Sequence, residues 1–164
     1  MKKVYIAATR QNDGKTIVSL GLLAACIKEF KEVGYIKPVG QQYREIKAQK
    51  IDKDAILMHD AFQLTDDYKV MSPIAVPKGF TENYILHGNY GELEKKITSS
   101  FAKVSEGKNF VLVEGTGHAG VGSVFDLGNA EVAKLLGAKV IIVSCGGLGR
   151  RIDRIRMLSN AFGY

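Results

Sequence analysis

The feature that most constrains this sequence is the succession of an apolar run, a short polar loop and an apolar helical pattern near its amino end. Lys3 to Ala8 is nearly all apolar, as expected of a parallel strand that is covered on both faces. From Gly14 to about Lys31, apolar residues recur at helical spacing in two adjoining rows, which predicts a largely buried helix. These rows are Ile17, Leu20, Ala24 and Ile27, and Val18, Leu22 and Ala25. A strand that leads through a short loop into a helix is the opening unit of an α/β fold.

Strand and helix patterns alternate along the rest of the chain. Further strands are predicted at residues 33–37, 110–113 and 140–143, and further helices at residues 52–62, 93–104, 132–136 and 148–162. We therefore expect one α/β domain over residues 1–164, with a parallel sheet of about four core strands and helices on both faces.

One segment shows neither pattern. Residues 64–88 include Pro73 and Pro77, and no strand or helix periodicity runs through them. We expect an irregular loop here that contacts the substrate or a second subunit of a dimer.

The loop after the first predicted strand carries the residue types of a phosphate-binding loop. Because Gly14, Lys15 and Thr16 open a helix, backbone N–H groups and the positive end of the helix dipole would face a bound phosphate. Lys15 would reach the terminal phosphates of a nucleotide, and Thr16 would coordinate Mg²⁺. The expected fold is therefore of the P-loop NTPase type, and MgATP is the expected ligand. The expected nucleotide contacts are Thr9, Arg10, Gln11, Asn12, Asp13, Gly14, Lys15, Thr16 and Ile17.

This motif is incomplete, because the consensus has glycine at the position of Thr9. The alternative interpretation is a surface turn that happens to read Gly-Lys-Thr ahead of a helix.

Charged residues end two of the predicted strands, at the edge where an α/β sheet binds its ligands. Glu114 follows the apolar run 110–113, where a carboxylate could bind Mg²⁺ or polarise its water, or else cap a helix or face solvent. Asp52 and Asp54 open a predicted helix, as N-terminal acids or as a further metal contact. Lys37 precedes Pro38 and would either steady a carboxylate or phosphoryl group or remain solvated.

The composition bears on location and on partners. No apolar run approaches the ~18 residues of a membrane span, and Cys26 and Cys145 lack a CxxC spacing, so we expect a cytoplasmic protein with reduced thiols. The net charge is +6, but Lys and Arg are scattered except within residues 150–156. A phosphate-rich small ligand explains this excess equally well. Nucleic-acid binding is disfavoured because no helix-turn-helix, aromatic stacking platform or zinc spacing accompanies it.

Several segments, taken in order along the chain, resemble the dethiobiotin synthetase family. They are Gly14-Lys15-Thr16, Tyr35-Ile36-Lys37-Pro38-Val39, Asp52-Lys53-Asp54-Ala55, Val113-Glu114-Gly115 and Ser144-Cys145-Gly146-Gly147-Leu148-Gly149. With residues 71–80 included, the chain is also similar to the dethiobiotin-synthetase-like domain at the amino end of some phosphotransacetylases and in stand-alone ATPases.

The resemblance implies a homodimeric enzyme with ATP and Mg²⁺ as cofactors. In this family a diamine takes up CO₂ as a carbamate, ATP phosphorylates the carbamate, and the second amine displaces phosphate to close a ring. Carried over by position, the resemblance implies catalytic roles for Lys15, Lys37 and Glu114. It implies metal contacts for Thr16, Asp54 and Glu114.

The chain departs from the family in its first loop, which begins Ala8-Thr9-Arg10-Gln11 instead of Gly-Thr-Asp-Thr, and in Gly40-Gln41-Gln42, which replace small residues. It also stops before the last strands of the family, as a fragment or a reduced form would. Arg10 stands where related dimeric P-loop ATPases have a lysine that reaches the partner's nucleotide, and we hypothesise the same role for it.

These departures keep a second function open, that of an ATP-sensing regulatory domain without turnover. A GTP-dependent switch is disfavoured because the sequence has no [NT]-K-x-D motif for base recognition.

Overall fold

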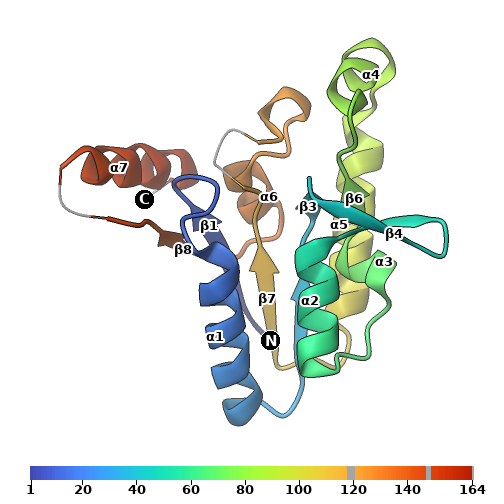
Figure 1. Cartoon of the computed structure of the whole chain (residues 1–164), viewed down its shortest axis with the longest axis vertical. Coiled ribbons are helices and arrows are strands. Elements are labelled where there is room, and N and C mark those ends of the chain that lie inside the picture. The colour runs from blue at the N-terminus through green and yellow to red at the C-terminus, as the bar shows by residue number, and fades with distance from the viewer. Residues whose placement is uncertain (118–120, 147–148, 164) are drawn as a thin grey trace.

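A four-stranded parallel sheet organises the computed structural model, which describes residues 1–117, 121–146 and 149–163. Its strands are β1 (Lys2–Ala8), β2 (Val33–Ile36), β7 (Phe110–Glu114) and β8 (Lys139–Val143), in the order β2-β7-β1-β8 (Figure 1). Every neighbouring pair is parallel, so the carboxyl ends of all four strands meet at one edge. The predicted fold class, an α/β protein of the P-loop type with about four core strands, is confirmed.

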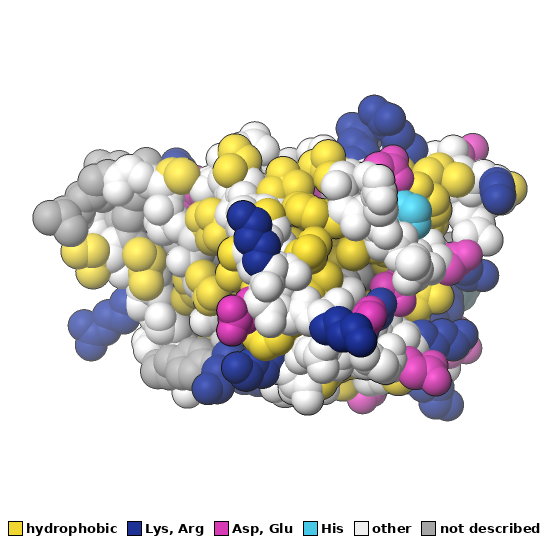
Figure 2. Space-filling view, turned by 90° about the horizontal axis from the view of Figure 1, so that it is seen from below, with side chains coloured by type: hydrophobic (Ala, Val, Ile, Leu, Met, Phe, Trp, Pro, Cys, Tyr) yellow, Lys and Arg dark blue, Asp and Glu magenta, His cyan; other side chains and the backbone are white. Residues whose placement is uncertain are grey.

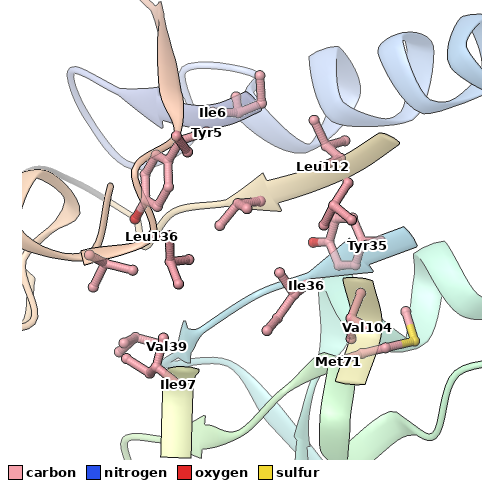
Figure 3. Close-up of a cluster of buried hydrophobic side chains, with 14 of the residues drawn as sticks. Tyr5, Ile6, Tyr35, Ile36, Val39, Met71, Ile97, Val104, Leu112 and Leu136 are labelled. Carbon is pink, nitrogen blue, oxygen red and sulfur yellow. The ribbon is translucent and has the colours of Figure 1, made fainter. Parts of the chain in front are cut away.

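Helices cover both faces of this sheet, because strands with two apolar faces must be buried on both. The main ones are α1 (Lys15–Glu29), α2 (Lys53–Phe62), α5 (Tyr90–Ser105), α6 (Asn129–Leu135) and α7 (Arg150–Phe162). All of β2 and β7 is buried. Figure 3 shows Ile6, Tyr35 and Leu112 on one side of the strands and Tyr5, Ile36 and Leu136 on the other. The strand faces thus form two apolar layers.

The expectation of a largely buried α1 is wrong. The buried positions of this helix are Lys15, Ser19, Leu23 and Cys26, which are spaced along one stripe. Ile17 is 74% exposed and Ile27 is 40% exposed, although both were expected to be buried. The helix contacts the sheet along a single stripe, and the chain carries more apolar residues on α1 than that stripe can cover.

The segment between β2 and α5 is more ordered than expected. Residues 64–88 contain α3 (Tyr68–Met71), β6 (Ile74–Ala75) and α4 (Phe80–His87), so the expectation of an irregular loop is wrong; its contact with a substrate or a second subunit stays a prediction. The elements are short, and β6 is paired with β3 (Val39–Gly40) instead of with a strand near in sequence. Such pairing carries no local sequence signal.

A hairpin also lies in this segment and was not predicted. It consists of β4 (Tyr43–Ile46) and β5 (Gln49–Asp52), joined by Lys47 and Ala48, which both have positive φ. Tight hairpin turns of this kind normally use Asn-Gly or Asp-Gly, and Lys-Ala gives no such signal. The hairpin matters for the site because it delivers Asp52 to the start of α2.

The remaining features concern surfaces and thiols. On the face shown in Figure 2, Lys and Arg side chains are dispersed among acidic and apolar ones. None of the described helices combines the length and the apolar character needed to cross a membrane.

Cys26 is buried and Cys145 is exposed, and both are free thiols. Gly147 and Leu148, which belong to one of the family-like segments, lie outside the described residues.

Candidate functional site

A cavity of about 320 Å³ opens at the carboxyl edge of the sheet, where the sequence predicts ligand binding. It lies between the loop after β1, the start of α1 and the segment that follows β2. Its lining residues are Gln11, Asn12, Gly14, Lys15, Thr16, Ile17, Lys37, Gln41, Gln42, Asp52, Asp54, Thr116 and Gly117. Six of these come from the loop that was predicted to bind phosphate, so the loop and the cavity coincide.

The loop after β1 is held in shape by its own side chains. Asp13 is buried, and its carboxylate accepts hydrogen bonds from the hydroxyl of Thr9 and from the guanidinium of Arg10, at 3.2 Å for Nη2. The thiol of Cys145, which follows β8, donates to the backbone oxygen of Asp13 at 2.9 Å. Gly14 has a φ of 89°, a conformation that glycine adopts without strain, and it turns the chain into α1.

The predicted nucleotide contacts therefore fall into two groups. Gln11, Asn12 and the residues from Gly14 to Ile17 line the cavity. The side chains of Thr9, Arg10 and Asp13 bond to one another instead, and these residues are not among those that line it. We infer that the first group would face a ligand, whereas the second keeps the loop in the shape that the first requires.

Two lysines converge on one buried carboxylate at the base of the cavity. Glu114 ends β7 and is fully buried. Its Oε1 atom lies 3.8 Å from the Nζ of Lys15 and 3.4 Å from the Nζ of Lys37, and it accepts a hydrogen bond of 3.1 Å from the hydroxyl of Thr16. Its Oε2 atom accepts a hydrogen bond of 3.1 Å from the hydroxyl of Tyr35. Glu114 is thus neither a helix cap nor a solvated turn residue.

Lys37 is the centre of an ion-pair network and is not solvated. Its side chain is 6% exposed, and its Nζ lies 3.6 Å from Oδ1 of Asp52 and also pairs with Asp54 and Glu114. Asp52 has a second task, because its Oδ1 atom caps α2 by accepting from the backbone N–H of Asp54 at 2.9 Å. The N-terminal-acid interpretation of Asp52 is correct, and the same carboxylate also faces the site.

The pKa values of the two lysines are shifted in opposite directions by this environment. Burial lowers the pKa of Lys15, and the neighbouring charge of Lys37 lowers it further, against the attraction of Glu114. Burial would also lower the pKa of Lys37, but Glu114, Asp52 and Asp54 together raise it well above its ordinary value. Lys37 therefore stays charged as part of the fold, whereas the charge on Lys15 is held less firmly.

The lowered pKa of Lys15 predicts how nucleotide binding depends on pH. Phosphate binding favours the charged ammonium, so the affinity for ATP is expected to fall as the pH rises through the pKa of Lys15, which lies below the ordinary 10.5. Fluorescence titration of ATP between about pH 7 and pH 11 would measure this fall. In Lys15→Arg the guanidinium stays charged over that range, so its profile should be flat. The same alkaline fall in both proteins would contradict the assignment to Lys15.

The residues predicted to contact Mg²⁺ have the donor set that this ion prefers. Thr16, Asp54 and Glu114 offer oxygen atoms, and the ammonium of Lys37 pairs with both carboxylates. Among the described residues, no group of three or more His, Cys, Asp or Glu side chains could hold a metal ion by itself. Mg²⁺ usually takes one or two protein carboxylates and completes its shell with water and nucleotide phosphates, and Asp54 and Glu114 would be the two carboxylates here.

Several cavity residues were not predicted from the sequence as site residues. Thr116 and Gly117 belong to the turn after β7, and Thr116 donates its backbone N–H to the side chain of Asn129 at 2.9 Å. Gln41 and Gln42 follow β3 and face the same cavity. Tyr35, which contacts Glu114 but does not line the cavity, was also missed, and it stands two residues before Lys37. Since alternate residues of a strand share a face, this spacing was a usable signal for Tyr35.

Comparison with known proteins places this chain in a family. A family model described as "AAA domain" matches residues 2–162. The ATP-dependent dethiobiotin synthetase BioD 2 of Salmonella typhimurium is 32% identical over 120 residues, which cover 71% of this chain and 49% of that protein. A phosphate acetyltransferase of Nitratidesulfovibrio vulgaris is 28% identical over 144 residues, covering 87% of this chain and 20% of that protein. The chain thus spans half or less of the length of these two relatives.

A structural comparison returns a GTPase in apo form from Pyrococcus abyssi, at 14% identity and a TM-score of 0.49, covering 99% of this chain and 63% of that one. The family assignment does not depend on this likeness. Because the family model matches nearly the whole chain, the protein belongs to this AAA domain family and is a dethiobiotin synthetase-like P-loop domain.

Proposed function

We propose that this chain is a cytoplasmic, MgATP-dependent enzyme domain that activates a carbamate or carboxylate by phosphorylation, as in the ring closure catalysed by dethiobiotin synthetase. The observation that carries the proposal is the convergence of Lys15, Lys37 and Thr16 on Oε1 of Glu114 at the base of one cavity. Phosphoryl transfer needs little covalent chemistry from the protein, and is accelerated by positioning and by positive charge where negative charge develops.

The proposed roles follow from the position of each side chain. Lys15, at the start of α1, would bind the terminal phosphates of ATP with the backbone N–H groups of residues 14–16. Lys37, which pairs with the same oxygen of Glu114, would orient the acceptor carboxylate or carbamate toward the phosphate. Thr16, Asp54 and Glu114 would hold Mg²⁺, which, when bound, neutralises charge on the phosphates.

A second candidate function, an ATP-sensing regulatory domain without turnover, is favoured by Gln41 and Gln42. These two side chains face the cavity where the dethiobiotin synthetase family has small residues, and they would reduce the space for a diamine. The similarity to part of a phosphate acetyltransferase is compatible with a domain attached to another activity.

Phosphate release separates the two functions. The purified chain would be incubated with ATP, Mg²⁺, bicarbonate and a series of diamines and amino acids, with Lys15→Ala as the inactive control. Release that depends on both the amine and Lys15 supports the enzyme. Lys15-dependent binding of ATP with no release under any acceptor supports the sensor, and the absence of ATP binding contradicts both. Sedimentation with and without MgATP tests the homodimer that we propose as the active form.

A further inference from the structure

We propose that Tyr35 is a positioning residue for Glu114, whose side chain it orients toward the nucleotide end of the cavity. The tyrosine hydroxyl holds one carboxylate oxygen, so that the other faces Lys15, Thr16 and Lys37. This inference rests on the proposed function, because the orientation matters only if Glu114 serves a bound nucleotide and its metal.

The hydrogen bonds of Glu114 divide sharply between its two oxygens. Oε2 accepts from the hydroxyl of Tyr35 at 3.1 Å. Oε1 accepts from Thr16 at 3.1 Å and lies within 4 Å of both lysine ammonium groups. A carboxylate has enough lone-pair directions to accept several hydrogen bonds. Here the two lysines and the Thr16 hydroxyl share Oε1, while the Tyr35 hydroxyl takes Oε2. Tyr35 thereby leaves Oε1 as the atom that meets Lys15, Thr16 and Lys37, which line the cavity.

The position of Tyr35 in the sheet gives the contact its rigidity. Tyr35 is on β2 and Glu114 is on the adjacent strand β7, with Tyr35 in register with Leu112. Figure 3 shows Tyr35 and Leu112 on the same side of the strands, and alternation puts Glu114 and Lys37 on that side too. Tyr35 and Glu114 are both fully buried, so a carboxylate without this hydroxyl would have no water to replace it at Oε2.

Tyr35→Phe removes this single hydroxyl and keeps the ring. Tyr5→Phe is the matched control, because Tyr5 is equally buried in the same sheet and donates its hydroxyl to Asn129 at 2.9 Å instead of to Glu114. Each variant would be titrated calorimetrically with ATP, once with Mg²⁺ and once with EDTA. Thermal unfolding of both variants measures the loss of stability that any buried hydroxyl would cause.

We expect Tyr35→Phe to weaken ATP binding mainly when Mg²⁺ is present. In Tyr35→Phe the gain in ATP affinity that Mg²⁺ provides falls about 10-fold, as is usual when a group that orients a metal ligand is removed, while affinity in EDTA changes less than about 2-fold. In Tyr5→Phe neither quantity changes beyond about 2-fold. Against a Glu114→Gln background, Tyr35→Phe is expected to have little further effect, since both substitutions act on the same carboxylate.

Other outcomes would overturn the inference. Tyr35 is only structural if Tyr35→Phe weakens ATP binding equally with Mg²⁺ and with EDTA, or if it changes the two affinities as Tyr5→Phe does. The same holds if Tyr35→Phe lowers the affinity as much in the Glu114→Gln background as in wild type. If wild type binds ATP through Lys15 and only the Tyr35 result fails, the proposed function survives; if wild type binds no ATP, both proposals fail. If Tyr35→Phe does not fold, a crystal structure of wild type with Mg²⁺ and an ATP analogue tests the inference instead. The Tyr35–Glu114 hydrogen bond must persist in that structure, and its absence would overturn the inference.

Discussion

Lys15→Ala is expected to weaken ATP binding by at least about 100-fold, which is about 2.7 kcal/mol of binding free energy. Lys15 is the first residue of α1, where the backbone N–H groups would hold phosphate. Its loss removes charge-assisted hydrogen bonds that backbone groups cannot supply. Isothermal titration calorimetry with MgATP measures the change.

The same substitution should leave the fold nearly intact. The folded protein lowers the pKa of Lys15, so it does not favour the charged side chain, and Glu114 retains Thr16, Lys37 and Tyr35 as partners. We expect the free energy of unfolding to change by less than about 1 kcal/mol. Lys28→Ala, at an exposed position on the same helix, is the matched control and should bind ATP as wild type does. Equal affinity of Lys15→Ala and Lys28→Ala would refute the phosphate-binding role of the loop.

Lys37→Met is expected to have the largest effect on stability, a loss of about 3–5 kcal/mol in the free energy of unfolding. The substitution removes an ammonium that pairs with Asp52, Asp54 and Glu114 together and leaves their carboxylates facing one another. Breaking a buried ion pair from one side is costly because the remaining charge keeps its desolvation penalty. Urea unfolding followed by circular dichroism measures the loss, with the exposed Lys69→Met as control.

The pH dependence of the stability lost in Lys37→Met is a sharper test of the ion-pair network. The folded state raises the pKa of Lys37 above 10.5, so its stabilisation is complete below that pH and disappears as the pH rises through the folded pKa. Burial opposes ionisation of Asp54, but Lys37 outweighs it and lowers the pKa below 3.8, so its contribution disappears as the pH falls through that folded value. In Lys37→Met the clustered carboxylates lose their cation, so burial and mutual repulsion raise their pKa values in the folded state. The difference in stability between wild type and Lys37→Met should therefore grow as the pH rises from about 5 and keep its full size up to about pH 10. A loss of less than 1 kcal/mol across this range would contradict the network.

Much of the fold was predictable because its core strands are short apolar runs, and a charged residue ends β7 and lies just after β2. Glu114 and Lys37 could be assigned to strand ends, and parallel strands bring such ends to one edge, so their meeting was predictable in outline. The role of Asp52 as a helix cap was likewise visible from its position before α2.

The rest was set by contacts that no local pattern encodes. On α1 the sheet covers the stripe with Ser19 and leaves Ile17 exposed, because the angle at which a helix meets the sheet decides which row is buried. The pairing of β3 with β6 and the division of the two Glu114 oxygens between Tyr35 and the lysines likewise depend on three-dimensional contacts. Sequence periodicity shows where apolar residues recur, but it does not show which other segment of the chain packs against them.

The order of the strands has a consequence for synthesis on the ribosome. β1 is made first, but both of its neighbours come late, since β7 begins at Phe110 and β8 at Lys139. At about 5–20 residues per second, β1 emerges roughly 5–20 s before the chain that completes its pairing with β7. During that time an apolar strand has no sheet to join, and such strands are prone to aggregate. The loop that would bind phosphate therefore takes its final shape only after residue 145 has been translated, since Ser144 and Cys145 hold it from beyond β8.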